Sequence, residues 1–352
     1  MDEFALIRML TASRTTAEAK EAGSGVVVGI GDDAAVVRPA GGKELVVSCD
    51  TMVETVHFKP ETMTATDIGY KAMASSLSDL AAMGAQPRWA VVALSVPRSW
   101  PQEELRKLYD GLYACAERYG AAVIGGDTTS SPNGLTVSVT VMGEASPGRT
   151  LLRSAALPGD ALFVTGPLGE SAAGLHALLA RGEPAGPIDA LPERLQPLAK
   201  AHRQPEPRVE AGLLLASAEP GLCGALNDIS DGLASETWEI AEASGVAVVL
   251  YGDRIPLSQP MRDYADSVGV DPLDWALFGG EDYELVGTVR PDGATELARL
   301  FEQAGKRIWI VGAVAASVGG SSTGKAPPTV TMVRSAGDAE VPVGKQGYNH
   351  FA

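Results

Sequence analysis

Residues 69–87 read GYKAMASSLSDLAAMGAQP, and this run of small and apolar residues predicts a helix over residues 67–83 that is buried on most of its faces. Thr64 and Thr66 come before the helix as candidate N-caps, and Gly84 and Pro87 end it. Its second half carries one carboxylate, Asp79. A buried carboxylate is costly unless it is paired or bound to a metal ion, so this helix already indicates an unusual site.

Strands and helices alternate on both sides of this helix. In the first part of the chain we expect strands at 26–30, 45–49, 89–96, 123–124 and 135–142, and further helices at 3–10 and 102–119. In the second part we expect strands at 161–165, 246–250, 284–289 and 308–314, and helices at 169–181, 209–216, 232–243 and 293–304. The proline-rich stretch 182–207 gives no element. Residues 315–345 indicate loops and edge strands.

The pattern breaks at Ser146-Pro147-Gly148, and the length of 352 residues favours about two domains. We therefore predict an N-terminal domain over 1–148 and a C-terminal domain over 149–352. Because strands and helices are mixed, with some neighbouring strands antiparallel, the predicted fold class is α/β (α+β) with two mixed domains.

Composition limits the class of protein. With 28 Lys and Arg against 44 Asp and Glu, the net charge is −16, which argues against a nucleic-acid binder and against binding to an anionic membrane. The N-terminus lacks the features of a signal peptide, and no apolar run is long enough to span a membrane. Three widely spaced cysteines argue against a disulfide framework or a zinc site. We expect a cytoplasmic protein.

The most informative feature is the position of the aspartates. We expect them just after glycine turns, at strand ends or just before a helix: Asp32 and Asp33 in GIGDD, Asp50 in VVSCD, Asp127 in IGGDTT, and Asp228 and Asp231 in NDISDG. Strand ends in α/β domains meet at one rim, so these carboxylates are predicted to share a site.

Each of these aspartates taken alone fits a turn or a helix cap, and Asp231 in particular fits a cap. Lys71 lies eight positions before Asp79, too far along the helix to pair with it directly. Taken together, the aspartates favour a metal site with several carboxylates. An oxygen-rich set without Cys or clustered His selects Mg²⁺, Mn²⁺ or Ca²⁺.

A phosphate-binding motif of the common kinds is not found. Residues 319–326, GGSSTGKA, come close to a P-loop, but Ala326 replaces the Ser or Thr that binds the metal, and Pro327-Pro328 prevents the helix that should follow. We interpret this stretch as a loop. Protein-kinase HRD and DFG motifs are also missing.

At these residues the sequence resembles the thiamine-monophosphate kinases, which belong to the superfamily of aminoimidazole ribonucleotide synthetase and selenophosphate synthetase. The matching blocks occur in family order along nearly the whole chain: GIGDDAAVV (29–37), SCDTMVETVHF (48–58), GYKAMASSLSDLAAMGAQP (69–87), GGDTT (125–129), GRTLLRS (148–154), NDISDGL (227–233), FGGEDYEL (278–285) and GYNHF (347–351).

The resemblance implies an enzyme that moves the γ-phosphoryl group of ATP onto thiamine monophosphate and forms thiamine diphosphate. It implies several Mg²⁺ ions, with a monovalent cation as a further candidate. It also implies a homodimer whose N-terminal sheets pair into a barrel. Because the acceptor phosphate is already anionic near pH 7, no general base is needed, and we expect positioning and charge neutralisation instead.

The resemblance also implies roles for individual residues. Metal ligands would be Asp33, Ser48, Cys49, Asp50, Asp79, Asp127, Asp228 and Asp231. Contacts to ATP would be Gly126, Arg153 and Ser230, and contacts to the thiamine phosphate would be His57, Glu281 and Tyr348. One departure stands out: the family usually has Thr where this chain has Cys49, and a thiol is a poor Mg²⁺ ligand, so only the Cys49 carbonyl is expected to serve.

Other interpretations stay open. Alone, Arg153 fits a surface arginine, His57 a packed histidine and Tyr348 an anchor for the tail. Selenophosphate synthetase needs an N-terminal reactive Cys, and no Cys precedes Cys49. The hydrogenase-maturation relative ends in a Cys, whereas this chain ends in Ala352. Aminoimidazole ribonucleotide synthetase fits the fold but lacks the last two blocks. A nucleotide- and metal-binding protein without turnover is the alternative of another class.

Overall fold

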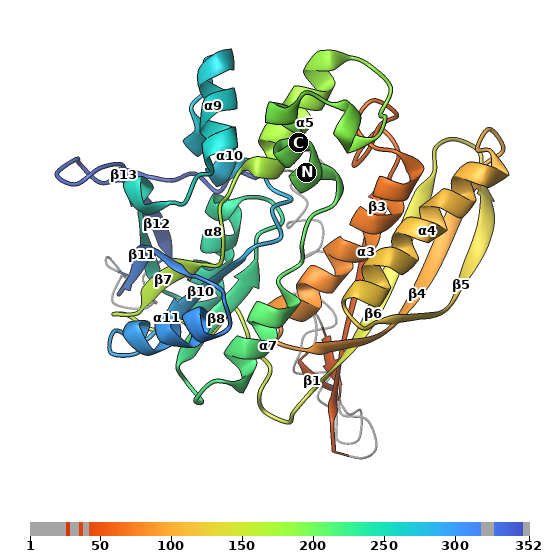
Figure 1. The fold of residues 1–352 in the computed structure, drawn as a ribbon. Helices are drawn as coiled ribbons and strands as arrows, with labels where there is room; N and C mark the ends of the chain where they lie inside the picture. The colour runs from red at the N-terminus through yellow and green to blue at the C-terminus, as the bar shows by residue number, and fades with distance from the viewer. Residues whose placement is uncertain (1–25, 29–34, 38–41, 318–326, 348–352) are drawn as a thin grey trace.

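The computed structural model describes residues 26–28, 35–37, 42–317 and 327–347, and it contains two sheets with helices between and around them (Figure 1). The first sheet has the order β1-β2-β3-β6-β4-β5. Its strands are β1 (Val26–Val28), β2 (Ala35–Val37), β3 (Glu44–Val53), β4 (Gln86–Pro97), β5 (Ala122–Ser131) and β6 (Thr136–Ala145). Neighbouring strands are antiparallel except β4 and β5, which are parallel and joined through α4 (Gln102–Arg118).

Helix α3 (Ala65–Ala82) packs on the first sheet and runs through the middle of the molecule, between the two sheets (Figure 1). Its start follows the sequence expectation, because Thr64 and Asp67 form a capping box. After the helix, Gly84 adopts a left-handed backbone conformation with φ +65°, which is typical of a glycine that follows a helix. All but three of its residues are buried, which confirms the predicted helix that is buried on most of its faces.

The second sheet has the order β13-β12-β9-β11-β7-β10-β8. Its strands are β7 (Ala161–Val164), β8 (Cys223–Asp228), β9 (Ala247–Tyr251), β10 (Leu285–Val289), β11 (Trp309–Ala315), β12 (Thr329–Val333) and β13 (Val341–Pro342). Around it lie α5 (Glu170–Arg181), α6 (Gln196–Arg203), α7 (Val209–Ser217), α8 (Leu233–Ser244), α9 (Gln259–Val268), α10 (Pro272–Phe278) and α11 (Ala294–Gln303).

Several elements differ from the sequence expectation. β2, β8, α6, α9 and α10 were not predicted, and β12 lies inside the sheet between β13 and β9 rather than at an edge. The predicted helix 3–10 and the loop 319–326 lie outside the described residues. In the part of the chain that the structure covers, no helix is both long enough and apolar enough to cross a membrane.

The α3–α4 contact depends on two glycines. A Cβ on Gly111 of α4 would lie 2.0 Å from the Thr66 carbonyl oxygen, and one on Gly69 of α3 would lie 1.8 Å from the Leu108 carbonyl oxygen. The two helix backbones therefore touch at this crossing. Since α3 carries site residues described below, this contact also fixes the site.

We expect Gly111→Ala to destabilise the protein by about 2 kcal/mol, because overpacking against backbone cannot be relieved by a side-chain rotation. The measurement is urea unfolding followed by circular dichroism. Gly186→Ala is the control, since nothing lies within 4 Å of its added Cβ. Equal midpoints for the two variants would contradict the close approach.

Candidate active site

A cavity of about 560 Å³ opens between β3, α3 and the loops that follow β8 and α10. Its lining includes eight of the residues predicted from the sequence: Cys49, Asp50, His57, Asp79, Asp228, Ser230, Asp231 and Glu281. These residues come from both halves of the chain. The cavity therefore lies where the two sheets approach each other across α3.

Three carboxylates influence one another in this cavity. The pKa of Asp79 is raised well above its usual value, first by burial and then by the charges of Asp50 and Asp228. Burial also raises the pKa of Asp50, against hydrogen bonds from Ser75 and Ser76. The negative charges of these carboxylates repel one another, so a bound cation would stabilise the ionised cluster.

Serine hydroxyls hold two of these carboxylates. Ser78 donates a hydrogen bond of 2.6 Å from Oγ to Oδ2 of Asp228, and Ser48 Oγ donates to Oδ2 of Asp79. The serines of α3 were not singled out in the sequence. Their signal was visible there, because three serines lie within four residues of Asp79 in an otherwise apolar helix.

The pleat of β3 decides which neighbours face the cluster. Successive side chains of a strand point to opposite faces, so Ser48 and Asp50 share the face that α3 covers, while Cys49 lies on the other. The Sγ of Cys49 lies 3.6 Å from Oγ of Ser138, which Thr51 Oγ1 also contacts at 2.8 Å. The side chain of Cys49 thus lies on the face of β3 opposite to Asp50.

The donor set suits a hard divalent cation. Within the described ranges, no group of three or more His, Cys, Asp or Glu side chains is arranged to hold an ion by itself. Mg²⁺ usually takes one or two carboxylates and completes its shell with water and substrate phosphates, so an incomplete oxygen set is what such a site requires. The mutual repulsion of Asp50, Asp79 and Asp228 is the observation that fits the ion.

Asp127 does not join this cluster within the chain. It lies inside β5 rather than at its end, and the register Asp127–Ala93–Ser138–Thr51 runs straight across the sheet. Paired residues share a face, so Asp127 lies on the face opposite to Asp50, about 14 Å from Thr51 across three strand spacings. The predicted common rim is wrong for Asp127.

Two further expectations about strand ends also need correction. Asp50 lies within β3, because the strand continues to Val53. Gly126 lies in the exposed edge strand β5, where a Cβ would come 1.8 Å from the Val92 carbonyl oxygen. Glycine therefore allows β5 to pair closely with β4, and the glycines do not end the strand.

Arg153 and Ser230 border the carboxylates in different ways. Arg153 Nη1 forms an ion pair of 2.6 Å with Oε2 of Glu239, and Nη2 donates to Oδ1 of Asn227 at 3.1 Å. Ser230 lines the cavity, and its Oγ donates to Oε1 of Glu236. The Asp231 cap interpretation is wrong, because the N-cap of α8 is Gly232 and no side chain caps the helix.

Glu236 is a residue that the sequence did not reveal. It accepts a hydrogen bond of 2.9 Å from the Asp231 backbone N–H and so shapes the loop between β8 and α8. Burial first, and then the charge of Asp231, raises its pKa well above the usual value.

The far end of the cavity carries the residues predicted for the thiamine phosphate. His57 Nδ1 accepts a hydrogen bond of 3.0 Å from the Val53 backbone N–H, so the proton of a neutral ring lies on Nε2, which makes Nε2 a donor. Glu281 has φ +58° and Tyr283 has φ +51°, left-handed values that are rare for residues other than glycine. Asp33 and Tyr348 lie outside the described residues.

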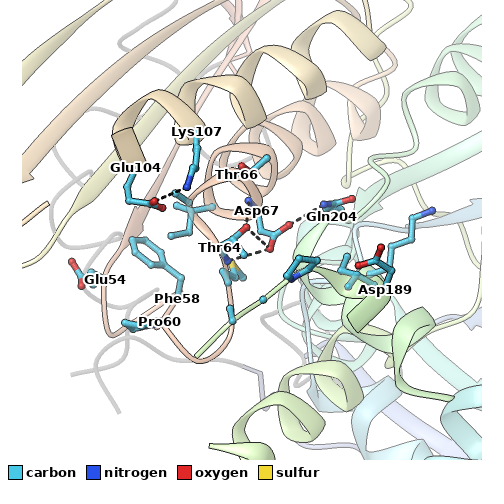
Figure 2. A pocket seen from close by; sticks show the side chains of 18 of the residues that line it. Glu54, Phe58, Pro60, Thr64, Thr66, Asp67, Glu104, Lys107, Asp189 and Gln204 are labelled. Atoms are coloured by element: carbon cyan, nitrogen blue, oxygen red, sulfur yellow. Dashed lines mark hydrogen bonds and ion pairs between the residues drawn. The ribbon is translucent and has the colours of Figure 1, made fainter. Parts of the chain in front are cut away.

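A larger cavity of about 950 Å³ lies on the other side of Phe58, at the start of α3 (Figure 2). Figure 2 shows that several of its polar groups bond to one another: Thr64 and Asp67 form the capping box, Gln204 donates to Asp67, and Glu104 pairs with Lys107. Because none of the predicted site residues lines this larger cavity, the smaller cavity is the candidate active site.

Mg²⁺ is expected to raise the melting temperature more at pH 7.5 than at pH 5.5. Burial, opposed by the Ser78 hydrogen bond and supported by the charge of Asp50, raises the pKa of Asp228 from 3.8 to about 6. A carboxyl with a higher pKa in the folded chain binds more protons there, so the stability of the metal-free protein falls as pH rises from about 4 to about 6. Above that range the ionised group is free to bind the cation.

The measurement is thermal unfolding with Mg²⁺ and with EDTA at both pH values. An equal Mg²⁺ effect at pH 5.5 and pH 7.5 would contradict a carboxylate site with this pKa.

Comparison with known proteins places the chain in a family. Residues 31–145 match the AIR synthase related protein, N-terminal domain, and residues 158–325 match the AIR synthase related protein, C-terminal domain. The class of protein is therefore the AIR synthase related class, whose two-part architecture agrees with the two sheets described above.

Closer relatives narrow the class. The chain is 45% identical over 291 residues to the thiamine-monophosphate kinase of Bacillus subtilis, which covers 82% of this chain and 84% of that protein. It is 37% identical over 327 residues to the one of Salmonella typhimurium, with 93% of each covered. A solved structure described as AaThiL complexed with AMPPCP and TMP has a TM-score of 0.80 at 28% identity and covers 99% of this chain and 97% of that one. The chain belongs to the thiamine-monophosphate kinase family.

Proposed function

We propose that this kinase binds ATP and thiamine monophosphate in the cavity above α3 and transfers the γ-phosphoryl group in line to the acceptor phosphate, forming thiamine diphosphate and ADP. Mg²⁺ is proposed as the required ion. The observation that carries the proposal is the cluster of Asp50, Asp79 and Asp228 beside His57 and Glu281 in one cavity.

The main obstacle to the reaction is electrostatic. Two unit charges about 4 Å apart repel by about 4 kcal/mol at an effective dielectric of about 20, and two phosphate groups bring several such pairs together. Bound Mg²⁺ would supply the positive charge that offsets this repulsion. The residues proposed to hold it are Asp50, Asp79 and Asp228, with Asp33, Asp231 and the hydroxyl of Ser48 as further ligands.

The chain's own residues position the two substrates. Ser230 and Arg153 are proposed to contact ATP, since a hydroxyl and a guanidinium both donate to phosphate oxygens. His57 is proposed to donate from Nε2 to the phosphate of thiamine monophosphate. Glu281 and Tyr348 are proposed to contact its rings. Rate enhancement would come from alignment and charge neutralisation rather than from a covalent intermediate.

Some assignments of the proposal concern the whole molecule. We propose domains over 1–148 and 149–352, a homodimer joined through the first sheets, and a cytoplasmic location, with a monovalent cation as a further possible ligand. Exposed edge strand β5, where Ile124 is 58% exposed, supports pairing with another copy. Cys49 and Asp127 lie on the uncovered face of the sheet, so they keep their proposed roles as metal ligands only if a second copy or the backbone completes them. Gly126 pairs with the buried Val92 on the covered face, and its proposed contact to ATP is one of the backbone.

Product analysis tests the proposed function. The purified protein is incubated with ATP, Mg²⁺ and thiamine monophosphate, and the products are separated by chromatography. We expect thiamine diphosphate and ADP in equal amounts. ADP with free phosphate, or no product, would contradict the proposal and would favour a nucleotide-binding protein without this activity.

A further inference from the structure

A buried lysine lies directly behind the wall of the cavity. Lys71 of α3 has a side chain that is 0% exposed, and its Nζ lies 2.7 Å from Oε2 of Glu281, whose side chain is 28% exposed. Lysine is almost never fully buried unless it is paired. Glu281 also lines the cavity, so the ammonium holds this carboxylate from the protein side.

His202 of α6 is the second acceptor for this ammonium. Its Nδ1 lies 3.4 Å from Nζ of Lys71 and 3.2 Å from Oγ of Ser171. Burial first, and then the charges of Lys71 and Arg203, lowers the pKa of His202 well below its usual value, so the ring is neutral. The ammonium of Lys71 can only donate, so Nδ1 of His202 is the acceptor and the ring proton lies on Nε2, which is buried and has no partner among the residues described.

The backbone at Glu281 is fixed as well. Its N–H donates a hydrogen bond of 2.6 Å to the Ser230 carbonyl oxygen, and its φ of +58° is a conformation that persists only where the surroundings hold it. The main chain is thus fixed by the loop after β8, and the carboxylate is fixed by Lys71. Both constraints act on a residue that faces the cavity.

We propose that Lys71 is a positioning residue for substrate recognition: it orients the Glu281 carboxylate to accept a hydrogen bond from the amino group of the substrate's aminopyrimidine ring. The proposal rests on the proposed function. A carboxylate that is balanced from behind by an ammonium keeps its acceptor geometry but carries little net charge, so it recognises an N–H donor rather than the cationic thiazolium ring.

Steady-state kinetics of Lys71→Met, Glu281→Gln and the double variant test this role. We expect Lys71→Met to raise the KM for thiamine monophosphate about tenfold and to change the KM for ATP less than about twofold. In the Glu281→Gln background, Lys71→Met should add little, because both variants remove one oriented acceptor. Lys306→Met is the control, since its partner Glu210 is on the surface.

A substrate analogue tests which group is recognised. In this analogue of thiamine monophosphate, oxygen replaces the amino group. The wild type should discriminate against it about tenfold or more, whereas Lys71→Met should discriminate weakly, since losing a hydrogen-bond acceptor for a substrate N–H removes that selectivity.

The outcomes separate the two proposals. A wild type that forms no thiamine diphosphate contradicts the proposed function. A wild type that forms it, combined with additive variants or with equal KM changes for both substrates, contradicts only the role of Lys71. If Lys71→Met does not fold, the comparison of the double variant with Glu281→Gln is made instead, because removing both charges leaves neither buried alone. A further rise in the KM for thiamine monophosphate in the double variant would then overturn the proposal.

Discussion

Asp79→Asn is expected to lower kcat/KM by about 1,000-fold, which corresponds to about 4 kcal/mol of transition-state stabilisation. The charges of both Asp50 and Asp228 raise the pKa of Asp79, so Asp79 is the central member of the carboxylate cluster that is proposed to bind the cation. An amide keeps the shape of the side chain and removes the charge. The measurement is the initial rate of thiamine diphosphate formation at saturating Mg²⁺.

The same variant is expected to melt a few degrees higher than the wild type in EDTA at pH 7.5. Burial and repulsion raise the pKa of Asp79, which means that its ionised form opposes folding when no cation is present. Loss of activity with gain of stability is the signature of a functional charge, because a structural residue would lose both. Asp160→Asn, a buried aspartate outside the cavity, is the control. Near-normal turnover in Asp79→Asn would contradict a metal-binding role.

Asp50→Asn is expected to lower kcat/KM by about 100-fold and to raise the half-saturating Mg²⁺ concentration about tenfold, an effect of about 1.4 kcal/mol on the binding of the ion. Asp50 shares the α3-facing side of β3 with Ser48, and its charge raises the pKa values of Asp79 and Asp228. Losing its charge leaves the remaining carboxylates to hold the cation. The measurement is a Mg²⁺ titration of the rate.

Cys49→Ala is the matched control for Asp50→Asn, because the two residues are neighbours with side chains on opposite faces of β3. Its Mg²⁺ dependence should equal that of the wild type. If Cys49→Ala raises the half-saturating Mg²⁺ concentration as much as Asp50→Asn does, the Cys49 side chain takes part in metal binding, and the assignment of the ligands by strand face is wrong.

Local patterns predicted the elements of the fold well where periodicity and caps agreed. Helix α3 illustrates this, since its apolar run, the Thr64 cap and Gly84 all point to the same bounds. β8 was missed because its last residues, Asn227 and Asp228, resemble a turn. In the structure the strand pairs with β10 at the end of the sheet, and both residues are buried. In that case tertiary burial outweighed local composition.

The sequence predicted only part of the site, because local patterns place residues along the chain but do not fix the face of the sheet on which they lie. Asp50, Asp79 and Asp228 were expected to meet and do so, but Asp127 was expected on the same rim and lies on the other face of the sheet. The face on which Asp127 lies depends on the length of β5 and on its register with β4. A sequence pattern predicts neither of these two properties. The Lys71–Glu281 pair joins positions 210 residues apart in the sequence, so only the folded chain could reveal it.

The most direct test is a crystal structure of the protein with a non-hydrolysable ATP analogue and Mn²⁺ in place of Mg²⁺, in which anomalous scattering locates the cations. We predict anomalous peaks in the cavity at coordination distance from the carboxylates of Asp50, Asp79 and Asp228, and in contact with the phosphates of the analogue. A bound analogue with no peak beside these three aspartates would contradict the claim that they gather cations to hold the two phosphates together.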